Sequence, residues 1–164
     1  MKTDRPETEK LIANLSQQIA AKGLDPLCAE QLDLLRSGNF GRIGMLEDLR
    51  DRCGLDIPDF QVQFPDFGTL PPEVSDLLAN GILHDISWHD DTCPSFIRTK
   101  DKPKADELGN DRVWSLWVDF ADPEDREFPE WPRFRVCAPA FDGDAFCTDN
   151  AADALAYLLH QRIA

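Results

Sequence analysis

The stretch RVWSLWVDF, residues 112–120, carries the clearest β-strand signal in the chain. One set of alternating side chains is apolar: Trp114, Leu116, Val118 and Phe120. The other set is mixed: Val113, Ser115, Trp117 and Asp119. Because successive side chains of a strand point to opposite faces of a sheet, this pattern predicts a strand whose first face lies in the core.

The residues that follow predict more strands and a final helix. Residues 133–138 alternate in the same way, and Asp142-Gly143 is a strong hairpin signal before the apolar residues 145–147. Thr148-Asp149-Asn150 then supplies the N-cap of a helix whose apolar side chains recur at helical spacing. These side chains are Ala151, Leu155, Leu158 and Leu159. The order predicts an antiparallel sheet packed by a C-terminal helix.

The residues that precede the stretch add weaker elements. Residues 60–64 alternate between aromatic or aliphatic side chains and glutamines, which predicts a half-buried strand. Pro71-Pro72 opens a short helix that stops at Asn80-Gly81. Residues 82–89 predict another strand, in which Ile82, His84, Ile86 and Trp88 share one face and the residues between them share the other. Phe96-Ile97 is a further apolar piece, and the polar residues 100–111 predict an exposed loop.

The N-terminal third predicts helices. The first places four apolar side chains on one helical face and ends at Gly23: Leu11, Ile12, Leu15 and Ile19. The second begins at Asp25-Pro26 and continues to Ser37-Gly38. The third, near residues 42–53, has Ile43, Leu46 and Leu49 on one face and stops at Gly54.

These patterns predict an α+β fold. We expect an antiparallel sheet of four or five strands packed by a C-terminal helix, with an N-terminal segment of about three helices. The length of 164 residues suits one core. We therefore expect a single domain over residues 1–164, in which residues 1–57 form a helical part and residues 58–164 an α+β part.

The charge of the chain excludes some classes of partner. The formal net charge is −14, and it is unevenly distributed. Residues 1–58 carry 8 basic and 10 acidic side chains, whereas residues 59–164 carry 9 basic and 21 acidic ones. Phosphate binding needs clustered lysine and arginine, so we expect no direct nucleic-acid partner and no membrane surface as a partner. A basic protein surface is the partner that this charge favours.

The five cysteines indicate a reducing compartment. Their number is odd, no pair has C-x-x-C spacing, and the N-terminus has no apolar segment typical of a signal peptide. We expect a cytoplasmic protein. No glycine-rich phosphate loop occurs, so we expect no cofactor, and the sequence does not indicate a small-molecule ligand.

The segment 119–131, DFADPEDREFPEW, combines carboxylates with aromatic side chains and two prolines. Aromatic anchors supply affinity, and charge steers the encounter with an oppositely charged partner. The alternative is a solvated connection whose aromatic rings fold back onto the core. As partner-binding residues, the sequence predicts Asp122, Glu124, Asp125, Glu127, Phe128, Glu130 and Trp131.

Residues 84–93 support an alternative, an enzyme. Cys93 with His84 or His89 would form a nucleophile and base if they met in space, and the same stretch could hold a metal. On a strand, the two histidines would point to opposite faces, and no second pair of zinc ligands is spaced nearby, so we expect no metal site. A third alternative is a structural subunit of a larger assembly, with the acidic surface serving solubility.

Overall fold

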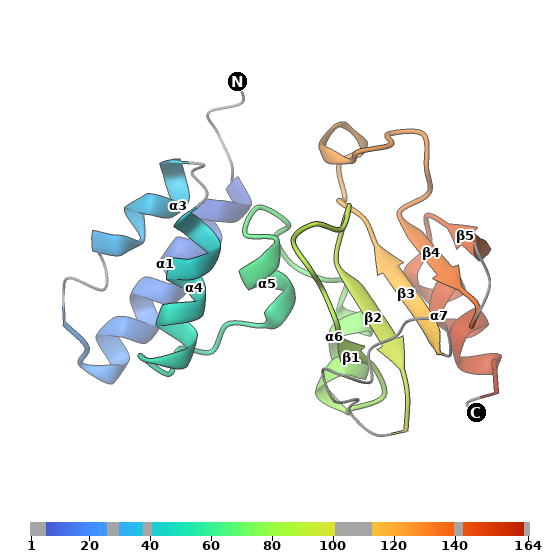
Figure 1. Ribbon diagram of the computed structural model, residues 1–164, viewed down its shortest axis with the longest axis horizontal. Coiled ribbons are helices and arrows are strands. Elements are labelled where there is room, and N and C mark those ends of the chain that lie inside the picture. The colour runs from blue at the N-terminus through green and yellow to red at the C-terminus, as the bar shows by residue number, and fades with distance from the viewer. Residues whose placement is uncertain (1–5, 26–29, 38–40, 101–112, 140–142, 163–164) are drawn as a thin grey trace. The chain divides into compact units, whose positions relative to one another are not determined.

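The computed structural model describes residues 6–25, 30–37, 41–100, 113–139 and 143–162 (Figure 1). The chain divides into two compact units, residues 1–69 and residues 70–164, which are described separately below. The boundary between these two units follows Thr69. One domain over residues 1–164 stays a prediction. None of the helices in the described ranges combines the length and the apolar content that crossing a bilayer requires.

The first unit is helical, and the predicted helices are present in it. Its described helices are α1 (Pro6–Lys22), α3 (Asp33–Ser37), α4 (Gly41–Asp51) and α5 (Asp59–Gln63). The backbone turns left-handed at Gly23 (φ 62°) and at Gly54 (φ 64°), just after α1 and α4, as expected from their sequence. Residues 26–29, where the second predicted helix would start, lie outside the described residues. The core of this unit includes Leu15, Leu35, Leu46 and Leu49, each fully buried.

The prediction of a strand at residues 60–64 is wrong, because α5 occupies this stretch. Phe60 and Val62 are buried, and the backbone N–H of Phe64 donates to the carbonyl of Phe60 (2.8 Å). Pro58 precedes the helix as its N-cap residue, and Pro65 follows its C-cap. In so short a helix, apolar side chains at every second position cannot be distinguished from strand alternation.

The second unit is a five-stranded antiparallel sheet with helices, which confirms the predicted α+β class. The strands are β1 (His84–Asp85), β2 (Ser95–Arg98), β3 (Trp114–Val118), β4 (Phe134–Cys137) and β5 (Asp144–Thr148). Their spatial order is the order of the chain, β1-β2-β3-β4-β5. Two α-helices accompany them, α6 (Pro72–Ala79) and α7 (Ala151–His160), and a 3₁₀ turn, η3 (Pro123–Asp125), lies between β3 and β4.

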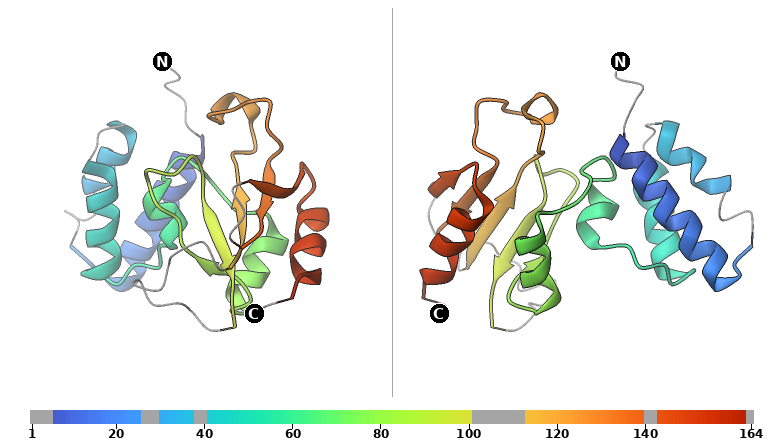
Figure 2. Two further views of the ribbon diagram at one scale, coloured as in Figure 1. Left: turned by 45° about the vertical axis from the view of Figure 1, so that its right-hand side comes forward. Right: turned by 180° about the vertical axis from the view of Figure 1, so that it is seen from behind.

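The C-terminal helix α7 covers one face of this sheet (Figure 2). Its Tyr157 stacks on Phe146 of β5, with ring centroids 4.7 Å apart, and meets Trp114 of β3 edge-on at 6.3 Å. Arg98 of β2 donates to the carbonyls of Leu158 and Gln161, both at 2.7 Å, and so satisfies two acceptors at the end of the helix. Ala154, Leu155 and Leu158 are buried, whereas Leu159, another of the apolar residues at helical spacing, is 38% exposed.

The antiparallel order brings two long loops to one end of the sheet. Residues 86–94 connect β1 to β2, and residues 119–133 connect β3 to β4. Since each of these connections leaves the sheet at the same end of the paired strands β2 and β3, the loops are neighbours. The backbone N–H of Val118 donates to the carbonyl of Pro94 (3.0 Å) at that point. We call residues 86–94 and 119–133 the loop end of the sheet.

The N-cap of α7 gives a test of how the helix is held. The Asn150 side chain accepts a hydrogen bond from the backbone N–H of Asp153 (3.2 Å). Asn150→Ala is expected to lower the free energy of unfolding by about 1 kcal/mol, because that N–H loses its acceptor. Asn150→Asp keeps the acceptor and serves as the control. Urea denaturation measures both, and equal stability of the alanine variant and the wild type would contradict the assignment.

Candidate functional site

The acidic segment 119–131 is held in one shape by a single arginine. The guanidinium of Arg126 donates to the carbonyls of Phe120 (2.8 Å), Ala121 (3.4 Å) and Trp131 (2.7 Å), and so ties both ends of the segment together. The Arg126 side chain is only 6% exposed. Asp122 caps η3 by accepting from the backbone N–H of Glu124 (3.0 Å). The segment is therefore a preorganised loop.

The predicted partner-binding residues occupy the outside of this loop. The five carboxylates of the prediction are all exposed: Asp122, Glu124, Asp125, Glu127 and Glu130. Asp119, which starts the segment, differs from them because it is 2% exposed. Burial raises the pKa of the Asp119 carboxyl, although its acceptance of the Phe120 N–H and the nearby arginines oppose the rise. The loop therefore carries five exposed carboxylates and one buried carboxyl group, that of Asp119.

Two aromatic side chains of the loop, Phe128 and Trp131, stack on each other, and Trp131 contacts Arg135 of the sheet. Phe128 stacks on Trp131, with centroids 4.3 Å apart and planes inclined by 22°. The guanidinium carbon of Arg135 lies 4.8 Å from the ring centroid of Trp131 and 5.7 Å from that of Trp117. Trp117 and Arg135 are cross-strand partners on β3 and β4. Trp131 thus folds back in part, and 36% of it remains exposed.

Arg135 also reaches the neighbouring loop 86–94. Its Nη2 lies 3.4 Å from the Thr92 hydroxyl and 3.8 Å from the Cys93 sulfur, 42 residues away in the chain. Trp88 of this loop is 53% exposed, and its indole N–H donates to Asp90 (3.2 Å). The second exposed tryptophan of the unit therefore lies at the same end of the sheet as the acidic loop.

The predicted catalytic candidates are not brought together. Among the described residues, the hydrogen-bond partners of the Cys93 sulfur are Thr92 and Arg135. His84 lies in β1 opposite Ile97, with its Nε2 buried and unpartnered, whereas the side chain of His89 is 37% exposed beside Asp90. No group of three or more potential metal ligands gathers anywhere in the described ranges.

The environment of Cys93 keeps it protonated. The residue is fully buried, and burial, with the Asp119 carboxylate adding to it, raises the pKa of the Cys93 thiol to about 11. A nucleophilic cysteine needs a lowered pKa, since the thiolate is the reactive form. The neighbourhood of Cys93 therefore acts against its use as a nucleophile near neutral pH.

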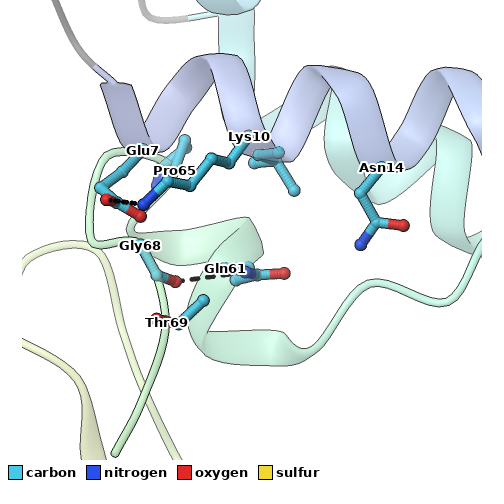
Figure 3. A pocket seen from close by; sticks show the side chains of 8 residues that line it. Glu7, Lys10, Asn14, Gln61, Pro65, Gly68 and Thr69 are labelled. Carbon is cyan, nitrogen blue, oxygen red and sulfur yellow. Dashed lines mark hydrogen bonds and ion pairs between the residues drawn. The ribbon is translucent and has the colours of Figure 1, made fainter.

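The helical unit contains a small pocket, which Figure 3 shows between α1 and the chain of α5 and the residues that follow it. Glu7 and Lys10 form an ion pair (2.6 Å) on one side, and Gln61 donates to the carbonyl of Gly68 (3.2 Å). Gly68 has a φ of +86°, and a Cβ there would approach Glu7 to 2.6 Å, so glycine is required. The volume, about 180 Å³, is below the range of about 300–1,000 Å³ typical of ligand pockets.

Comparison with known proteins gives no match. No family model fits the chain, no curated protein is significantly similar to it in sequence, and no solved structure is significantly similar to it in fold.

The acidic residues of the loop end could be predicted from the sequence. The two arginines that fix the conformation of the loop end, Arg126 and Arg135, could not. Arg126 donates to backbone carbonyls, whereas Arg135 contacts aromatic rings and a loop that is distant in the sequence. No rule based on local residue spacing predicts such contacts. The prediction of one strand over residues 82–89 is wrong for Trp88, because β1 ends at Asp85 and the indole lies exposed in the following loop. The composition of the sequence did carry a signal for these two arginines, because both lie in or beside an otherwise acidic and aromatic stretch.

The role of Arg126 can be tested with a variant of similar length. Arg126→Met is expected to destabilise the protein by about 2 kcal/mol and to speed hydrogen exchange of the backbone amides in residues 120–131 at least about tenfold, because three carbonyls lose a charged donor. Arg52→Met is the matched control, since the Arg52 side chain is 81% exposed and pairs with Asp48. Exchange in the loop that is unchanged by Arg126→Met would show that the loop is held by other contacts.

The reactivity of Cys93 tests the enzyme alternative. With its pKa raised to about 11, the thiol is expected to resist iodoacetamide at pH 7.5 in the folded protein, whereas the exposed Cys147 reacts. Peptide mass spectrometry after timed labelling measures both rates, and labelling in denaturant provides the control that Cys93 can react. Rapid labelling of folded Cys93 at or below neutral pH would restore it as a candidate nucleophile.

Proposed function

We propose that this chain is a protein-binding module, an inhibitor or accessory protein, whose acidic loop end docks on a basic surface of another protein. The observation that carries the proposal is the clamp by Arg126, which fixes a loop bearing five exposed carboxylates. A loop that is already ordered loses little conformational entropy on binding, so more of the interaction energy remains as affinity. Its charge steers the approach of a basic partner.

The charge balance of the second unit supports this proposal. Residues 70–164 carry 9 basic and 19 acidic side chains. Three of the nine basic ones, Arg126, Arg133 and Arg135, donate within the loop end to backbone carbonyls or to side chains of loop 86–94. Arginines that are bound inside the fold offer little charge to a partner, whereas the loop carboxylates face outward. The loop end therefore presents a negative surface.

The enzyme alternative has less support from the geometry. Among the described residues, the Cys93 sulfur has Thr92 and Arg135 as its hydrogen-bond partners, and burial raises its pKa rather than lowering it. We place the proposed function in the cytoplasm, because a reducing compartment suits Cys53, Cys93, Cys137 and Cys147, which are free thiols.

The electrostatic part of the proposal predicts a loss of binding when the loop is neutralised. A variant with Asp122→Asn, Glu124→Gln, Asp125→Asn and Glu127→Gln is expected to lose its partner. The association rate at low salt should fall about tenfold or more, because charge steering is removed while the loop shape is kept. Affinity capture from the native host's lysate at low and high salt, quantified by mass spectrometry, identifies the partner, and surface plasmon resonance measures the rate.

A control variant separates this effect from a change in total charge. It carries the same number of neutral substitutions at exposed acidic positions elsewhere: Glu30→Gln, Asp56→Asn, Glu73→Gln and Asp76→Asn. This control is expected to retain the partner. Equal binding by both variants would contradict docking through the loop, and equal loss in both would indicate a general charge effect rather than a surface.

A further inference from the structure

Trp88 is the most exposed large apolar side chain in the described part of the chain. Its exposed fraction is 53%, compared with 36% for Trp131. Both rings lie at the loop end, but their surroundings differ. Trp131 has Phe128 stacked on it at 4.3 Å and the Arg135 guanidinium at 4.8 Å, so its ring is already used within the fold. Trp88 has one tilted ring neighbour, His89, at 4.3 Å.

A carboxylate lies at the edge of the exposed indole. Asp90 accepts the hydrogen bond from the Trp88 indole N–H, and this contact fixes the direction of the ring. Asp91 follows, and its backbone N–H donates to the carbonyl of Trp88 (2.9 Å), which turns the chain back on itself. Burial, followed by repulsion from Asp90, raises the pKa of the Asp91 carboxyl. A cation placed beside these two carboxylates would relieve that repulsion.

We propose that Trp88, Asp90 and Asp91 form a binding site for the guanidinium group of an arginine on the partner protein. A guanidinium is planar, so it can stack on the indole while its N–H groups donate to carboxylates at the edge of the ring. The fold already places one guanidinium on tryptophan rings, since the guanidinium carbon of Arg135 lies 5.7 Å from the ring centroid of Trp117 and 4.8 Å from that of Trp131. An ammonium group of lysine is more strongly hydrated and cannot stack in this way.

The site belongs to the same surface as the acidic loop. Arg135 contacts Trp131 of one loop and Thr92 of the other, which fixes loop 86–94 beside loop 119–133. The inference therefore rests on the proposed docking function and adds one anchor to it: the acidic loop attracts any basic surface, and Trp88 selects one that presents an arginine. It also gives residues 84–93 a role in binding rather than in catalysis.

Two basic peptides of equal charge separate stacking from simple attraction. We would titrate acetylated hexa-arginine amide and hexa-lysine amide into the full chain by calorimetry at low and high salt. The wild type is expected to bind the arginine peptide about threefold more tightly than the lysine peptide, as one exposed stacking contact allows. Trp88→Leu keeps an apolar side chain and is expected to abolish this preference. Leu159→Ala, at an exposed apolar position of α7, is the control and should retain it.

The outcomes distinguish this site from the proposed function. Equal affinity of the wild type for both peptides, or an arginine preference that survives in Trp88→Leu, would overturn the guanidinium site and leave electrostatic docking in place. Failure of the wild type to bind either peptide at low salt would count against the docking function itself. A shift of the Trp88 indole N–H signal in a nitrogen–proton NMR spectrum, seen with the arginine peptide and absent with the lysine peptide, would locate the contact.

Discussion

The loop end depends on how the charge of Arg135 is accommodated. Its Nε atom is buried without a hydrogen-bond partner in the described structure, and a buried charge is costly unless other groups compensate for lost water. The rings of Trp117 and Trp131 supply that compensation by cation–π contact, helped by Thr92 and by the nearby Asp119 carboxylate. These partners come from the sheet and from both loops. The contacts that stabilise the Arg135 guanidinium therefore fix the sheet, loop 86–94 and loop 119–133 relative to one another.

The sheet itself is asymmetric in a way that suits this arrangement. One face is apolar and closed by α7, with Leu116, Val118 and Phe134 almost fully buried. The other face carries Trp117, Arg135 and then Cys147, and along this row the side chains become more exposed toward the edge strand β5. An exposed edge strand invites pairing with another chain, and charged side chains such as Asp144 on β5 oppose it.

The sequence predicts the elements of this fold better than its contacts. Strand β3 and helix α7 could be predicted because alternation and helical spacing are local properties. α5 could not, because five residues are too few to reveal a period. The predicted strand does not extend to Trp88, and the reason is physical. The Asp85 carboxylate accepts the backbone N–H of Ser87 (3.0 Å), and the Ser87 hydroxyl accepts the backbone N–H of Ser95 (3.1 Å). The backbone N–H of Ile86 still donates to the carbonyl of Ser95 (3.0 Å), and after Ile86 these side-chain hydrogen bonds replace the backbone ladder and end the strand.

In the proposed docking, two kinds of interaction at the loop end act on different steps of binding. The carboxylates of the loop act at a distance, so they change how often a basic partner arrives, and salt weakens them. Trp88 acts only on contact, so it changes how long an arginine stays once it has arrived. A surface with carboxylates alone would bind any basic protein briefly, and a tryptophan alone would meet few partners. In the proposed docking, placing both on one end of the sheet would combine fast encounter with selection for an arginine.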